Sequence, residues 1–205
     1  MFTGIVTAVG EIRESRQSGD LRCVIACPFD PAGIAMGASI ACSGVCLTVV
    51  DKGGVAGDAW FAVDISAESV SRTVPGRWEQ GRLLNLEPAL KLGAELGGHI
   101  VTGHVDSIGE IVSITPVGDS KRFVIAAPAE LAPYIAAKGS ITVDGVSLTV
   151  NEVEDQPSGA CHFTLNIIPH TAEVTTIGQM GTGDAVNLEI DVLARYLQRM
   201  QSLKS

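Results

Sequence analysis

The chain of 205 residues carries 14 lysines and arginines against 23 aspartates and glutamates, which gives a formal net charge of −9 at pH 7. This balance lacks the basic surface that nucleic acids and anionic membranes bind, so we expect small molecules or further copies of the chain as partners. Apolar runs are far shorter than the roughly 20 residues that span a bilayer, and we expect no signal peptide at the N-terminus. The five cysteines form no pair of CxxC clips, so free thiols, a cytoplasmic location and no metal site are expected.

Short stretches rich in Val, Ile and Thr, separated by glycine, proline and polar turns, predict strands along most of the chain. In the first half these strands are residues 5–12, 23–26, 39–41, 47–50, 60–65 and 83–86. In the second half they are residues 101–112, 123–126, 140–143, 148–152, 162–168 and 185–190. Short helices are expected after Pro28 and Pro128 and at residues 67–72 and 171–176.

The two halves of the chain repeat each other. Gly-Val-Cys-Leu-Thr-Val at residues 44–49 matches Gly-Val-Ser-Leu-Thr-Val at 145–150, an offset of 101. Asn-Leu-Glu at residues 85–87 recurs at 187–189, an offset of 102. The other matched blocks are residues 3–6 with 102–105 and residues 22–28 with 122–128.

Six short strands in each copy favour a closed barrel, because closure leaves no sheet edge open to aggregation. We therefore predict a mainly β fold of two tandem, homologous, six-stranded Greek-key β-barrels, at residues 1–90 and 98–190, followed by a C-terminal α-helix at residues 191–205.

The tail at residues 192–204 has a different pattern from the repeats. Its apolar residues recur at helical spacing and form one stripe on a polar helix. The helix packs either on its own barrel or on symmetry-related copies, and its position outside the repeat favours the second alternative. The stripe consists of Leu193, Tyr196, Leu197, Met200 and Leu203.

Residues 1–6, the two blocks at 44–49 and 145–150, and the glycine- and histidine-containing segment 97–106 resemble the riboflavin synthase family of duplicated lumazine-binding barrels. The resemblance extends to about residue 191. It implies a homotrimer in which the C-terminal helix drives trimerisation and the N-terminal barrel of one subunit faces the C-terminal barrel of the next. Each barrel binds one 6,7-dimethyl-8-ribityllumazine, and the pair dismutates to riboflavin and 5-amino-6-ribitylaminouracil by transfer of a four-carbon unit. The family requires no cofactor, and lumazine synthase is a further expected partner.

Positions where the two copies differ are the candidates for chemistry, because matched positions explain only shared ligand binding. The family's motifs then imply a second-barrel set of His104, Ser147, Thr149 and Asp191. A histidine titrates near neutral pH and is suited to moving the proton of an acidic methyl group. The differing pairs are His104 with Ile5, Ser147 with Cys46, and Asp191 with Ala89.

Alternate residues on a strand share a face, so Ser147 with Thr149, and Cys46 with Thr48, are expected to bond one edge of a ligand in each barrel. The resemblance gives four catalytic residues, which are His104, Ser147, Asp191 and Cys46. The substrate-binding residues that it implies are Thr149, Lys138, Ile168, Thr171, Ser39, Thr48, Asp64, Ser66, Gly4 and Val6.

Structural roles are alternatives for several of these residues. Asp191 immediately precedes the tail helix and is suited to capping it, alone or in addition to a catalytic role. Cys46 is equally suited to filling a barrel as a small apolar residue. Phe2 is either an apolar anchor or part of the site, and His99 is expected to be structural.

Two other functions are compatible with a duplicated barrel, since a fold does not determine a function. The first is a non-catalytic antenna protein that holds a lumazine or a flavin. The second is a flavin-dependent oxidoreductase, which is disfavoured because no glycine-rich dinucleotide fingerprint is present.

Overall fold

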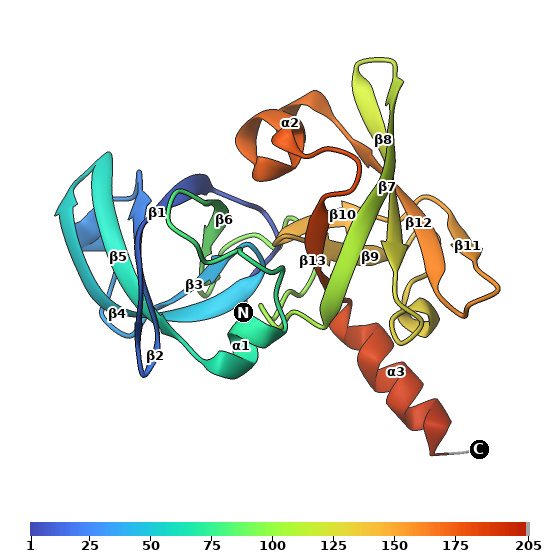
Figure 1. Ribbon diagram of the computed structural model, residues 1–205, viewed down its shortest axis with the longest axis horizontal. Coiled ribbons are helices and arrows are strands. Elements are labelled where there is room, and N and C mark those ends of the chain that lie inside the picture. Colours follow the sequence, from blue (N-terminus) through green and yellow to red (C-terminus); the bar gives the residue numbers. More distant parts are fainter. Residues whose placement is uncertain (204–205) are drawn as a thin grey trace.

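Each copy of the repeat forms its own antiparallel sheet, and the two sheets lie side by side (Figure 1). The computed structural model describes residues 1–203. The first sheet is a closed barrel with the strand order β1-β2-β5-β4-β3-β6. Its strands are β1 (Ala8–Ser18), β2 (Asp20–Cys27), β3 (Ser39–Cys42), β4 (Val45–Val55), β5 (Asp58–Ile65) and β6 (Leu83–Pro88).

The second sheet has seven strands in the order β10-β9-β13-β7-β8-β12-β11. Six were expected, and the extra strand arises because the counterpart of β4 is broken into β10 and β11. Two backbone hydrogen bonds still tie the break to β12, from Asn151 N–H to the Thr164 carbonyl (2.8 Å) and from Thr164 N–H to the Glu152 carbonyl (3.0 Å). The strands are β7 (Ser107–Val117), β8 (Ser120–Ala127), β9 (Ser140–Val143), β10 (Val146–Thr149), β11 (Val153–Asp155), β12 (Cys161–Ile167) and β13 (Ala185–Ile190).

The mainly β prediction is confirmed, and two strands begin later than predicted. The strands β1 and β7 begin at Ala8 and Ser107 rather than at residues 5 and 101. The residues before them are two arms that leave their own sheets. Residues 2 and 101 form only an isolated bridge with each other.

Short helices connect the strands. The turns expected after Pro28 and Pro128 are single 3-10 turns, and the helix expected at 171–176 begins earlier and continues as a further 3-10 turn. The helices are η1 (Pro31–Gly33), α1 (Ala67–Ser71), η2 (Ala132–Tyr134), α2 (Pro169–Val174), η3 (Thr176–Gln179) and α3 (Val192–Ser202).

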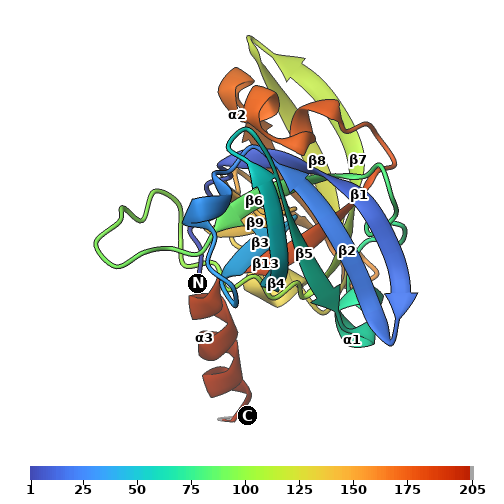
Figure 2. The ribbon, with the colours of Figure 1, turned by 90° about the vertical axis from the view of Figure 1, so that its left-hand side faces the viewer.

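Helix α3 projects away from both sheets, as does a loop of the connection between the two copies (Figure 2). The stripe predicted from the sequence is on the surface of this helix, with Leu193, Tyr196 and Leu197 between 61% and 65% exposed. Arg195 ties the helix to the second copy through an ion pair with Asp106 (2.7 Å). The last two residues of the predicted helix segment, 204 and 205, lie outside the described residues. None of the helices in residues 1–203 has the length and apolar character needed to cross a membrane.

Each sheet encloses its own apolar core. Phe61 and Ile25 are completely buried in the first barrel, and Phe163 and Ile125 hold the matched positions in the second. Truncating a buried phenylalanine of this kind to alanine typically costs about 3–5 kcal/mol. The cores therefore stabilise each sheet separately, and other contacts must hold the two sheets together.

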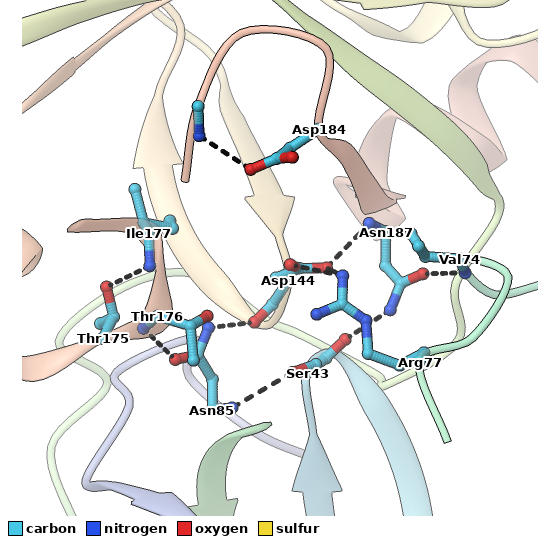
Figure 3. Close-up of polar contacts among 11 residues, drawn as sticks. Ser43, Val74, Arg77, Asn85, Asp144, Thr175, Thr176, Ile177, Asp184 and Asn187 are labelled. Carbon is cyan, nitrogen blue, oxygen red and sulfur yellow. Dashed lines mark hydrogen bonds and ion pairs between the residues drawn. The ribbon is translucent and has the colours of Figure 1, made fainter. Parts of the chain in front are cut away.

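Two buried asparagines at matched positions join the sheets (Figure 3). The side-chain amide of Asn85 donates to the backbone carbonyl of Asp144 (2.9 Å) and accepts from the N–H of Thr176 (2.8 Å). Asn187 reaches back into the first sheet and donates to the carbonyl of Ser43 (3.0 Å). Each amide thus satisfies buried backbone groups of the other copy, which fixes the orientation of the sheets.

One half of this junction carries an ion pair that the other lacks. The Arg77 guanidinium lies 2.8 and 3.0 Å from the two carboxylate oxygens of Asp144, which is completely buried. The same carboxylate accepts from the N–H of Asn187 (2.8 Å). At the matched positions the chain has Ser43 in place of the aspartate and Gln179 in place of the arginine.

The turns after β3 and β9 touch each other at Gly44 and Gly145. Both glycines are in the left-handed region, with φ of 86° and 82°. A Cβ on Gly145 would lie 2.7 Å from the backbone nitrogen of Gly44. Glycine is therefore required at this contact by the close approach as well as by φ.

Candidate functional site

The two arms, residues 2–7 and 101–106, are each held by a buried glutamate from the last strand of their own copy. Glu87 accepts from the N–H and hydroxyl of Thr3 (both 2.7 Å) and from the N–H of Gly4 (2.9 Å). Glu189 accepts from Thr102 in the same way and from the N–H of Gly103 and His104 (2.9 and 3.0 Å). Burial raises the pKa of both carboxyls, and the hydrogen bonds that they accept oppose that rise.

The glutamates were not among the predicted site residues. Their signal was present, because both close an Asn-Leu-Glu block that we used only to align the copies. The threonine and glycine that begin each arm are repeated as well. The repeated threonine, glycine and glutamate therefore form the hydrogen bonds that bend each arm away from its own barrel.

Each arm crosses to the other copy. The backbone N–H of Ser147 donates to the Gly4 carbonyl, and the N–H of Cys46 donates to the Gly103 carbonyl, both at 2.8 Å. Val6 packs on the core of the second sheet, whereas Val105, its counterpart, packs on the first barrel. The chain has thus exchanged its arms, and each candidate site combines residues of both copies.

Glycine is needed where each arm meets the other copy. A Cβ on Gly4 would lie 2.5 Å from the Cβ of Ser147, and a Cβ on Gly103 would lie 2.7 Å from the Cβ of Cys46. Both glycines also have positive φ, 75° and 78°. These two residues set how closely the arms approach Ser147 and Cys46, a more specific role than the turn or bulge that their sequence context suggests.

At the first barrel the exchanged arm completes a pocket of about 550 Å³. Cys46 of β4 is half-buried and His104 of the arm is exposed, and both line this pocket with Asp106 and residues of α1. The expected grouping of His104 with Ser147 needs correction. Because the arms are exchanged, His104 lies at the pocket of the first barrel, beside Cys46.

The other residues predicted for the first barrel lie on its surface. Ser39 and Thr48 are cross-strand partners on β3 and β4. Asp64 is exposed and forms an ion pair with Arg22 (3.3 Å). Ser66 caps α1, where its hydroxyl accepts from the N–H of the third helical residue (3.2 Å).

The second sheet brings Ser147 together with Gly4 and Val6 of the N-terminal arm. Thr149 is exposed on β10 opposite Ser140, which repeats the pairing of Ser39 and Thr48. The other three predicted residues are dispersed over two further segments. Lys138 precedes β9 and is exposed, Ile168 precedes α2 and is 49% exposed, and Thr171 is half-buried in α2.

Lys138 has an unusual backbone conformation, with a φ of 66°. The first copy has Gly37 at the matched position, with a φ of 76°. A lysine in this region typically costs about 1–3 kcal/mol, and such conformations concentrate at functional sites. The strain supports a function for the lysine side chain that glycine cannot perform.

His99 makes the closest side-chain contact to Ser147. Its Nδ1 lies 2.7 Å from the Ser147 hydroxyl oxygen, and its Nε2 lies 3.2 Å from the Thr142 hydroxyl oxygen. Asp191 caps α3 through a hydrogen bond from the N–H of Leu193 (2.9 Å), as its position suggested. Burial lowers the pKa of His99, and the charge of Asp191 opposes that effect.

Sequence comparison between the copies had no means of finding His99. At the offset of 99 that relates the arms, its counterpart would precede residue 1. Phe2 is completely buried and packs with Ala41, Val101 and Cys46 at the junction of the arms. Within residues 1–203, no group of three or more His, Cys, Asp or Glu side chains is arranged to hold a metal ion.

Comparison with known proteins gives concordant matches over nearly the whole chain. The model of the Lumazine binding domain matches residues 3–89 and again residues 102–191. A riboflavin synthase of Brucella abortus (strain 2308) is 49% identical over 206 residues, with 98% of each chain covered. A riboflavin synthase of Photobacterium phosphoreum is 42% identical over 202 residues, which cover 98% of this chain and 88% of the relative. The solved structure of LumP complexed with riboflavin is similar at a TM-score of 0.77 and 26% identity, over 93% of this chain and 99% of LumP.

Proposed function

The chain belongs to the riboflavin synthase family, and we propose that it converts two molecules of 6,7-dimethyl-8-ribityllumazine into riboflavin and 5-amino-6-ribitylaminouracil. The observation that carries the proposal is the 49% identity to a riboflavin synthase over 98% of each chain, together with two matches to the lumazine-binding domain. A dismutation needs two bound molecules of one substrate, which a duplicated binding domain provides.

Each copy contributes one lumazine site in this proposal. The first site uses Cys46 and Thr48 with His104 from the exchanged arm. The second uses Ser147, Thr149 and Lys138. The proximity of Cys46 and His104 in one pocket supports the first set, and the strained backbone of Lys138 supports the second.

The remaining predicted residues border these two sites. Ser39, Asp64 and Ser66 belong to the first, and Ile168, Thr171, Gly4 and Val6 belong to the second.

Orientation supplies much of the catalysis, because holding two reactants in place can lower a barrier by roughly 7–11 kcal/mol. His104 is exposed in a pocket and has its backbone fixed by Glu189, which suits it to remove a proton from the acidic methyl group of one lumazine. Asp191 acts electrostatically on His99 in addition to its role as a cap. The groups that this proposal uses for orientation and proton transfer are all side chains of the protein.

We assign the reaction to the interface between two subunits of a homotrimer. The support is the exposed apolar stripe of α3, of which Leu193, Tyr196, Leu197 and Met200 are each at least 58% exposed. An apolar surface of this kind marks an interface. The helix assembles the subunits, and the domains predicted at residues 1–90 and 98–190 of neighbouring subunits then face each other.

A non-catalytic antenna is the alternative, and the similarity to LumP complexed with riboflavin is the observation that favours it. One experiment separates the two functions. Purified, flavin-free protein is incubated with 6,7-dimethyl-8-ribityllumazine alone, and the products are separated by chromatography. One riboflavin formed for every two lumazines consumed establishes the synthase, whereas tight binding without turnover establishes the antenna.

The site assignments need a matched pair of variants. His104→Gln removes the proton acceptor of the first pocket, and His162→Gln removes a half-buried histidine of β12 that lies outside both sites. Turnover that falls only in His104→Gln supports the assignment. Equal turnover in both variants removes His104 from the mechanism. Specific activity that stays constant as the trimer dissociates on dilution contradicts an intersubunit site.

A further inference from the structure

The environment of Ser147 differs from that of its counterpart Cys46. Ser147 pairs across the strands with Thr142, whereas Cys46 pairs with Ala41. Cys46 packs with Phe2 and Ala41 in an apolar cluster. The second copy has a polar cluster at this place, built from Ser147, Thr142 and a histidine that has no counterpart in the first copy.

That histidine, His99, is held at three points. It is 8% exposed, its backbone N–H donates to the Thr3 carbonyl (3.2 Å), and both ring nitrogens contact hydroxyls. Gly98 permits this approach, because a Cβ there would lie 2.1 Å from the Thr3 carbonyl oxygen and 2.8 Å from the Ser147 hydroxyl oxygen. Gly98 therefore serves to bring the histidine against Ser147.

The two hydrogen bonds of the ring differ in length. Bonds donated by hydroxyls are typically about 2.7–2.8 Å long and bonds donated by N–H groups about 2.9–3.0 Å. The 2.7 Å contact fits the Ser147 hydroxyl donating to Nδ1, and the 3.2 Å contact fits Nε2–H donating to the Thr142 hydroxyl. Burial lowers the pKa of His99, and the charge of Asp191 opposes this effect. The lowered pKa favours the neutral ring that this arrangement requires.

We propose that His99 is a positioning residue that holds the Ser147 hydroxyl in one orientation, with its hydrogen on Nδ1 and its oxygen lone pairs toward the ligand of the second barrel. Ser147 is half-buried, so its oxygen remains accessible to a ligand. It then serves as a fixed hydrogen-bond acceptor, which a freely rotating hydroxyl is not. Among residues 1–203 no imidazole is hydrogen-bonded to Cys46, and the two lumazine sites differ in consequence. The inference rests on the proposed function, which it deepens.

Two substitutions separate this role from a purely structural one. In His99→Asn the side-chain oxygen takes the place of Nδ1 and still accepts from Ser147. In His99→Gln the amide reaches the Thr142 end of the cluster and leaves Ser147 without its acceptor. We expect kcat of the asparagine variant within about threefold of the wild type and an approximately tenfold lower kcat for the glutamine variant, the effect of losing one hydrogen bond. Equal losses in both variants, in proportion to their thermal stability, overturn the proposal.

A double-mutant cycle identifies the residue through which His99 acts. If that residue is Ser147, then His99→Gln has no further effect on kcat in a Ser147→Ala background. In a Cys46→Ala background, the matched control in the other barrel, His99→Gln should still lower kcat by the same factor as in the wild type. Losses that multiply in both backgrounds overturn the proposal.

The same cycle is measured by titration with 6,7-dimethyl-8-ribityllumazine, which keeps failure of the inference distinct from failure of the proposed function. A wild type that binds lumazine and forms no riboflavin contradicts the synthase. The dissociation constants then decide the inference, since His99→Gln must weaken binding in the presence of Ser147 and not in its absence.

Discussion

Replacing Arg77 with glutamine removes the charged partner of a carboxylate that is completely buried between the two sheets. At 2.8 Å and an effective dielectric constant of about 20, the Coulomb attraction is roughly 6 kcal/mol. Asp144 keeps one backbone N–H donor, from Asn187. Breaking a buried ion pair on one side typically costs about 3–5 kcal/mol, and we expect Arg77→Gln to lower the free energy of unfolding by that amount.

The double variant Arg77→Gln with Asp144→Ser provides the control, because it copies the Ser43 and Gln179 that the chain has at the matched positions. Without a buried charge, its loss of stability should be below about 1.5 kcal/mol and smaller than that of the single variant. Both are measured by urea unfolding followed by tryptophan fluorescence. A double variant as unstable as Arg77→Gln would refute the reasoning.

The pH dependence has a definite sign. Burial raises the pKa of Asp144, and Arg77 opposes that rise. Without Arg77 the folded-state pKa rises further above the unfolded value, so the folded state binds the proton more tightly. Stability contributed by such a group is present below the unfolded pKa and is lost as pH rises through the folded pKa. The deficit of Arg77→Gln relative to the wild type should therefore shrink as the pH is lowered toward the ordinary pKa range of an aspartate, and a constant deficit would contradict this account.

Four further variants test the arms, the second site and the helix. Lys138→Gly relieves a φ of 66°, so it should keep or raise stability by up to about 1 kcal/mol while weakening riboflavin binding, and a less stable protein in urea would contradict the strain. The Glu189 carboxylate accepts four hydrogen bonds, and in Glu189→Gln an amide NH2 group, which donates, replaces one of its accepting oxygens. This variant should lose about 2 kcal/mol of stability and have a kcat at least tenfold lower. Gly103→Ala pushes its arm away from Cys46, so the Cys46 thiol should become more accessible and react faster with a thiol reagent. An unchanged rate of thiol modification would exclude displacement of the arm. Leu197→Asp should give monomers in size-exclusion chromatography and lose turnover, and an active monomer would refute the intersubunit site.

The sheets were predictable because matched blocks fold alike, and because strands such as β1 and β7 alternate buried and exposed residues along part of their length. The arms were not. Val6 and Val105 look like the first apolar residues of a strand, and each instead packs on the opposite copy. Alternation along a strand shows that one face is buried, but it does not show against which sheet.

The candidate residues came from the sequence, whereas their grouping came from the folded chain. The comparison of copies identified Cys46 and Ser147, which lie at matched places in the two sheets. The arm exchange then moves His104 to the first pocket and leaves Ser147 with His99. A residue without a counterpart in the other copy is not visible to a comparison between copies, and its role becomes apparent only from the contacts of the folded chain.

In the proposed dismutation, the exchange gives a duplicated domain a means of serving two unlike roles. A dismutation treats identical molecules differently, so two identical pockets would stabilise both substrates equally and favour neither as donor. Each arm carries residues of one copy onto the sheet of the other, and the arms differ where the strands beneath them differ. The first pocket combines a thiol in apolar surroundings with His104, whereas Ser147 in the second copy contacts the buried imidazole of His99. The two copies therefore offer unlike surroundings to two identical ligands, and this difference follows from the few positions at which the repeats diverge.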